Sequence, residues 1–153
     1  MLYTQNELKN LSKKEKLILI NSISGIKSAN LVGSISNEGV HNLSIISSVV
    51  HLGSNPPTIG FVMRPDTVRR DTLNNIKDNY YYTLNSVSSD FVHKAHQTSG
   101  KYSKEISEFD ECSIKPEFIQ YFSSPFVRDS QIKVGCKLLE LIPIKSSKTI
   151  LVV

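Results

Sequence analysis

The chain has no tryptophan, two methionines and two cysteines among its 153 residues. Cys112 and Cys136 lie far apart and form neither a CxxC motif nor a Cys/His ligand spacing, so the sequence indicates neither a disulfide framework nor a zinc site. The first residues lack a basic segment followed by an apolar one, which argues against a signal peptide. We therefore expect reduced thiols and a cytoplasmic location.

Long hydrophobic runs and concentrated charge are also missing. The uncharged run at residues 17–26 is interrupted by polar residues and glycine, so no membrane span is expected. Eighteen Lys and Arg against fourteen Asp and Glu give a net charge of +4. These basic residues are dispersed, apart from a lysine group at residues 13–16 and the pair Arg69 and Arg70. The charge mildly favours anionic partners and gives no reason to expect nucleic-acid binding.

Local patterns predict a series of short elements. Ser12 and Glu15 form a capping box within a helical stretch at residues 8–20, and Asp71 or Thr72 can cap a helix at residues 71–79. Runs rich in β-branched and aromatic residues predict strands. The expected strands are residues 30–35, 41–53, 58–64, 80–87, 131–142 and 149–153, with a short helix at 88–97 and a loop-rich stretch at 98–128.

This order predicts one mainly β domain over residues 1–153, built as an antiparallel barrel with short helical insertions. The alternation of strand and helix that defines a Rossmann fold is not met. The chain ends on the apolar run Ile150 to Val153, which we expect to form an unpaired edge strand. We therefore expect the chain to be truncated at its C-terminus.

A candidate anion site lies in residues 63–76. A strand end supplies Arg64, the next residues supply Arg69 and Arg70, and a helix begins at Asp71 or Thr72. Guanidinium groups and free N–H groups at the positive end of a helix are the chemistry that binds a phosphate monoester. The alternative is that the arginines are solvated and Thr72 is only a helix cap.

Small polar residues interrupt the β-prone stretch at 41–53. Ser44, Ser47 and Ser48 would let a planar ligand approach the backbone, although an ordinary barrel strand with a polar outer face gives the same pattern. His93 and His96 are three residues apart without a known metal-binding signature, so no metal site is expected. No GxSxG motif marks a nucleophile.

The ordered set of segments NLVGSISNEGVHNLSIISSVVHLGSNPP, TIGFVMRP, RRDTLNNI, YYYTLNSV, AHQTS and SEFDE resembles the flavin reductase-like family, across about residues 30–134. That resemblance implies a split antiparallel β-barrel of Greek-key type with FMN at a homodimer interface. It matches Arg70 and Thr72 to the phosphate-binding motif, with Arg64 helping to neutralise the phosphate. The flavin ring would lie along Ile46, Ser47 and Ser48, and the loop residues His96, Gln97 and Thr98 would approach the flavin or substrate edge.

The expected function is an FMN-dependent oxidoreductase that takes hydride from NADH or NADPH and reduces flavin or another small-molecule acceptor. Because the cofactor carries such chemistry, the lack of an obvious acid–base pair is no argument against an enzyme. The alternative is an FMN-binding electron carrier without NAD(P)H turnover. We also expect a second copy to cover apolar strand faces left partly open, such as Ile45, Val49, Phe61 and Met63.

Overall fold

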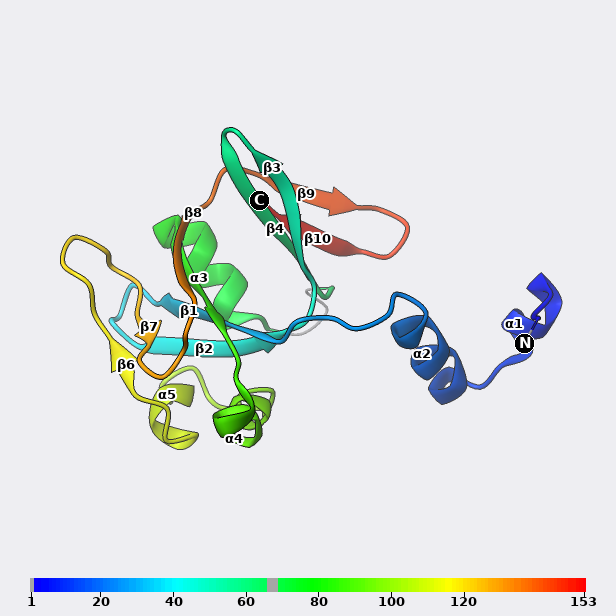
Figure 1. Cartoon of the computed structure of the whole chain (residues 1–153), viewed down its shortest axis with the longest axis horizontal. Coiled ribbons are helices and arrows are strands. Elements are labelled where there is room, and N and C mark those ends of the chain that lie inside the picture. The colour runs from blue at the N-terminus through cyan, green and yellow to red at the C-terminus, as the bar shows by residue number, and fades with distance from the viewer. Residues whose placement is uncertain (1, 66–68) are drawn as a thin grey trace.

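The computed structural model describes residues 2–65 and 69–153. Two short N-terminal helices stand clear of a β-rich body that contains the remaining elements (Figure 1). In chain order the elements are α1 (Gln5–Asn10), α2 (Lys13–Ser22), β1 (Asn30–Ile35), β2 (His41–Ile46), β3 (Val49–Ser54), β4 (Pro57–Met63), α3 (Asp71–Asn79), β5 (Tyr81–Ser86), the 3-10 helix η1 (Ser89–Phe91), α4 (Val92–Gln97), α5 (Glu108–Glu111), β6 (Pro116–Glu117), β7 (Phe126–Val127), β8 (Lys133–Lys137), β9 (Leu141–Ile144) and β10 (Thr149–Val152).

Two four-stranded sheets make up the body. Their strand orders are β2-β1-β5-β8 and β3-β4-β10-β9, and β6 pairs with β7 in a small third sheet. Every pairing is antiparallel. The expected mainly β architecture with short helices and antiparallel strands is therefore confirmed.

Buried side chains form two clusters that fix the helices against the sheets. One cluster joins β1 and β2 to α4, α5 and β7. The other joins α3 to strands of both sheets, through residues such as Leu73 and Ile76 of the helix, Tyr82 of β5 and Phe61 of β4. Leu73 and Ile76 are three residues apart and share one helix face. This packing holds the start of α3 beside the place where the two sheets meet.

Local signals located several elements correctly. The helix expected at residues 71–79 is α3 with the same bounds, and β1 and β2, which fall within the strands expected at 30–35 and 41–53, pair as an antiparallel hairpin. The capping box is present, because Glu15 N donates to Ser12 Oγ at 3.2 Å and Ser12 N donates to Glu15 Oε2 at 2.9 Å. A second capping box joins Thr4 and Glu7 and was not anticipated.

Two of the expected long strands are wrong, because each is divided between sheets. Residues 41–53 form β2 in one sheet and β3 in the other, with the break at Ser47 and Ser48. Residues 131–142 similarly give β8 and β9. There Leu138 N donates to the Tyr80 carbonyl, whereas Leu139 N donates to that of Val153. Hydrogen bonds to residues that are distant in the sequence therefore accompany the second break.

The apolar C-terminal run is not an edge strand. β10 lies between β4 and β9 and pairs with both, which corrects the expectation from the sequence. Phe61 and Met63 are also buried in the core and not open to a partner, while Ile45 and Val49 are partly buried. Within the described residues, no helix is long and apolar enough to span a membrane.

The face of the second sheet that is turned away from the core carries exposed apolar side chains. Val50 and Leu52 of β3 are 42% and 45% exposed, and Ile142 and Ile144 of β9 are 38% and 37% exposed. We call these four residues the outer face. The exposed apolar side chains of this sheet are therefore other than those expected from the sequence.

Candidate functional site

The chain passes from β2 in one sheet to β3 in the other at Ser47 and Ser48, and we call these two residues the crossing. The second serine anchors it. Ser48 Oγ donates to the Val62 carbonyl at 2.9 Å and accepts from Val62 N at 3.2 Å, which fixes the crossing on β4. Ser47 beside it is exposed, and Ile46 is the last residue of β2. A small residue at position 47 leaves the backbone of the crossing open to a ligand.

Helix α3 begins without a side-chain cap among the described residues. Arg70 occupies the N-cap position, with φ −130° and ψ 87°, and its carbonyl accepts from Asn74 N at 3.0 Å. The preferred cap residues Ser, Thr, Asp and Asn are therefore not used as caps here. N–H groups in the first turn and the positive end of the helix dipole are available to an anion.

Arg70 carries the most informative feature of this region. Its Nε atom is buried and has no hydrogen-bond partner in the part of the chain that the structure describes. Buried polar groups nearly always have a partner, and a charged donor gains most from an anionic one. The arrangement therefore fits a bound phosphate.

The other two arginines are placed differently. Arg69 Nε donates to Asp71 Oδ1 at 2.6 Å, in an ion pair whose side chains are 48% and 34% exposed. Such an exposed pair contributes little to stability. Arg64 directly follows β4 and is exposed. The role expected for Arg64, to help neutralise the phosphate, therefore stays a prediction.

The Thr72 side chain points inward and contacts side chains of strand β2. The side chain is 6% exposed, and its hydroxyl donates to Asn42 Oδ1 at 2.6 Å and lies 3.0 Å from Ser44 Oγ. A hydroxyl bound in this way is not free to donate to a phosphate. Thr72 can reach an anion through its backbone N–H, in the first turn of α3.

Replacing Thr72 with valine should therefore act on stability more than on ligand binding. The variant keeps the shape of the side chain but leaves Asn42 and Ser44 without its hydroxyl. We expect a loss of about 1 kcal/mol in the free energy of unfolding, measured by urea denaturation. If FMN is the cofactor, as the resemblance implies, its affinity relative to that of riboflavin should be nearly unchanged. A selective loss of FMN affinity would show that the hydroxyl turns toward the phosphate.

The hydrogen bonds among Thr72, Asn42 and Ser44 continue to a buried carboxylate, that of Glu108. Asn42 Nδ2 donates to both oxygens of Glu108, at 3.0 and 2.9 Å, and Leu43 N donates to Oε2 at 2.9 Å. Glu108 is 8% exposed, and its burial raises the pKa of the carboxyl, against the opposing effect of these hydrogen bonds. Glu108, Asn42 and Thr72 thus connect α5, β2 and the start of α3.

The residues expected at the flavin or substrate edge have different environments. Thr98 is buried, and its hydroxyl accepts from Ile45 N at 3.0 Å and donates to the Ala95 carbonyl at 2.8 Å. It therefore holds α4 against β2. His96 and Gln97 are exposed. A ligand role for these three residues stays a prediction, and it is more compatible with the two exposed side chains.

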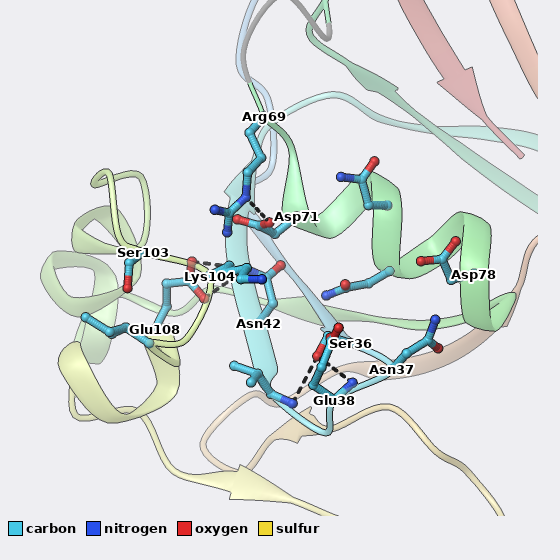
Figure 2. A pocket seen from close by; sticks show the side chains of 14 residues that line it. Ser36, Asn37, Glu38, Asn42, Arg69, Asp71, Asp78, Ser103, Lys104 and Glu108 are labelled. Atoms are coloured by element: carbon cyan, nitrogen blue, oxygen red, sulfur yellow. Dashed lines mark hydrogen bonds and ion pairs between the residues drawn. The ribbon is translucent and has the colours of Figure 1, made fainter.

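A polar cavity of about 210 Å³ lies on the flank of α3 (Figure 2). Residues of the β1–β2 turn, α3 and the segment before α5 line it, including Glu38, Asp78, Lys104 and the pair Arg69 and Asp71. Ligand pockets usually have volumes of about 300–1,000 Å³ and mostly apolar walls. This cavity is too small and too polar to enclose a flavin ring. In residues 2–65 and 69–153, no group of three or more His, Cys, Asp or Glu side chains is arranged to hold a metal.

The structure is thus built from two antiparallel four-stranded sheets that meet beside the start of α3. Comparison with known proteins identifies this architecture. Residues 27–153 match the flavin reductase like domain. The chain belongs to the flavin reductase-like family.

Solved structures agree with this assignment. A split-barrel protein from Shewanella frigidimarina, assigned as a flavin reductase, is 40% identical; the match covers 99% of this chain and 75% of that one, with a TM-score of 0.94. Nitrilotriacetate monooxygenase component B from Bacillus cereus is 22% identical over 99% of this chain and 77% of its own, with a TM-score of 0.87.

More distant relatives share the fold or part of the sequence. Flavoredoxin of Desulfovibrio vulgaris is 21% identical over 82% of this chain and 66% of its own, with a TM-score of 0.68. An uncharacterized protein of Aquifex aeolicus is 26% identical over 115 residues, which are 74% of this chain and 59% of that relative. The chain thus spans about three fifths of the length of this relative.

Proposed function

We propose that the protein binds FMN and uses it as an oxidoreductase, taking hydride from NADH or NADPH and passing electrons to a flavin or another small acceptor. The observation that carries this proposal is the buried Nε of Arg70, which has no partner among the described residues, at the uncapped start of α3. Family membership supports a flavin cofactor. Bound FMN would supply the hydride and electron transfer.

The residues present fit the two ends of FMN. Arg70 and the first N–H groups of α3, including that of Thr72, would hold the phosphate, and Arg64 would add positive charge. Ile46, Ser47 and Ser48 would offer the backbone of the sheet crossing to the flavin ring. Exposed His96 and Gln97 would contact the edge of the flavin or the substrate, while Thr98 would position the loop through its bonds to Ile45 and Ala95.

A homodimer completes this proposal. The exposed outer face supports a second copy as the partner, and two-fold dimers are the commonest assembly that would cover it. A site built from the open crossing and not from an enclosed cavity agrees with a flavin held between two chains. Flavin release on dilution should then follow dissociation of the dimer.

The first experiment identifies the chromophore. We expect the purified protein, or the protein reconstituted with flavins, to retain FMN in preference to FAD, because a terminal phosphate dianion suits Arg70 and the start of α3. Chromatography of the extracted chromophore measures this. Exclusive binding of FAD, or no flavin after reconstitution, contradicts the proposal.

Anaerobic mixing with NADH or NADPH then tests the reaction. Loss of the oxidised flavin absorbance band at a rate compatible with turnover supports the reductase. A protein that keeps FMN but is reduced by neither nucleotide would instead be an electron carrier. The fold shared with flavoredoxin makes that outcome the relevant second candidate.

A further inference from the structure

The N-terminal arm, residues 2–26, has no place in the core of its own chain. Neither α1 nor α2 buries a single residue, and both helices project away from the body (Figure 1). Leu17, Ile18 and Ile20 of α2 are 60%, 55% and 53% exposed, and Ile23 beyond it is 69% exposed. The arm therefore presents a concentrated apolar surface to its surroundings.

Helix α2 is too short to be stable on its own, and the apolar residues of its second half are exposed. It has 10 residues, and isolated helices shorter than about 12–15 residues are marginal in water. Four consecutive residues, 17–20, are apolar and together surround the helix. A helix that is hydrophobic on all sides is normally found buried in protein. We therefore expect the apolar second half of α2 to contact a further surface.

The path of the arm is also found in a crystal structure. The arm makes up about a sixth of the chain. The Shewanella frigidimarina protein matches 99% of the chain with a TM-score of 0.94, which requires an arm that follows the same path. An apolar segment held in one position away from its body indicates a regular docking partner.

We propose that the arm docks on a second copy of this chain, with the apolar side chains of α2 against the outer face of the partner's β3-β4-β10-β9 sheet. The chain carries two uncovered apolar surfaces, the arm and the outer face. In a two-fold dimer in which each copy places its arm on the outer face of the other, which we call the exchange, both surfaces are covered. In a two-fold interface every contact occurs twice, so helix α2 of each copy contributes to the buried area.

The position of the arm also connects the exchange to the flavin site. β1 begins at Asn30, which pairs with Ile46 at the end of β2. The arm thus leaves the body next to the crossing at Ser47 and Ser48. The second copy would therefore lie beside the proposed flavin ring. This consequence rests on the proposed function, whereas the docking of each arm on the other copy does not.

Charge placed in the apolar surface of the arm tests the exchange. We expect Ile20→Lys to raise the dissociation constant of the dimer at least about tenfold, measured by sedimentation over a dilution series, because the ammonium would enter the contact with the outer face. Asn21→Lys is the matched control in the same helix, since it adds the same charge at a position that is already polar, and should change the constant less than twofold. Equal effects of both variants, or none, would overturn the proposal.

Cross-linking tests the contact directly. One chain carrying Ile20→Cys and a size-tagged chain carrying Leu52→Cys should form a covalent heterodimer after mixing and mild oxidation. Pairs made with Asn37→Cys in place of Leu52→Cys should not, because Asn37 lies in the β1–β2 turn and outside the outer face. A heterodimer that forms equally with either partner would contradict the assigned surface.

Hydrogen exchange separates this inference from the proposed function. The amides of α2 should be protected at concentrations where the protein is dimeric and lose that protection on dilution, whether or not flavin is bound. Protection in a protein that binds no flavin would leave the exchange standing and remove the proposed cofactor. Unprotected α2 amides in the dimer, or protection that requires added lipid vesicles, would overturn the exchange.

Discussion

Replacing Arg70 with alanine should raise the dissociation constant for FMN roughly 10- to 150-fold, which corresponds to about 1.5–3 kcal/mol for a charge-assisted hydrogen bond. The affinity for riboflavin, which has no phosphate, should change little. Fluorescence titration of both flavins measures the two constants. Because Arg70 Nε makes no hydrogen bond within the described residues, the fold should lose little stability.

Two further variants make this result specific. Arg69→Ala is the neighbouring control, because Arg69 is exposed and paired with Asp71, and it should change FMN affinity less than about threefold. Arg70→Lys keeps the charge without the planar donor and should recover only part of the affinity. Equal losses of FMN and riboflavin in Arg70→Ala would place Arg70 away from the phosphate.

The start of α3 was predictable because its signals are local. Arginines directly before a helix, and Leu73 and Ile76 on one face of it, can be recognised from residues 69–76 alone. Which arginine is ion-paired and which is buried was not predictable in the same way. Nothing in the sequence separates Arg69, which pairs with Asp71, from Arg70, whose Nε is buried. That difference arises from packing against the sheets.

The sheet crossing shows why the strand bounds were only partly predictable. Residues 41–53 are β-prone throughout, so a pattern of period two gives one continuous strand. The break at Ser48 depends on hydrogen bonds to Val62, which is 14 residues further along the chain. The division at residues 138–140 likewise depends on Tyr80 and Val153. Contacts of this kind leave no periodic signal near the break.

Two residues of the buried polar network, Glu108 and Asn42, were missed altogether. Glu108 falls in the segment SEFDE, which carried part of the family resemblance, but its neighbours Asp110 and Glu111 are exposed carboxylates of the same helix. Only the fold brings Glu108 to Asn42 and Leu43, which are more than 60 residues earlier in the chain. Sequence position alone therefore gave no means to separate a supporting carboxylate from a solvated one.

Replacing Glu108 with alanine should lower the free energy of unfolding by about 2–4 kcal/mol, because the buried donors Leu43 N and Asn42 Nδ2 would lose their acceptor. The thermal midpoint should fall by about 2–4 °C for each kcal/mol. Calorimetry measures the change, and Glu111→Ala, on the exposed side of α5, should have almost no effect. A loss that is the same in both variants would mean that the network does not support the fold.

The pH dependence gives the same residue an independent signature. Burial raises the pKa of the Glu108 carboxyl in the folded state above its ordinary value of 4.5. The folded state therefore keeps this proton at a pH where the unfolded chain has released it, so stability falls as the pH rises from about 4.5 through the raised pKa. Glu108→Gln cannot ionise and should lose this part of the pH dependence, while keeping an oxygen that accepts from Leu43 N. Urea denaturation of both proteins across pH 4 to 8 measures the difference between the two slopes. Identical slopes would show that Glu108 ionises in the folded protein as readily as in the unfolded chain, and that its hydrogen bonds with Asn42 and Leu43 offset the whole cost of burial.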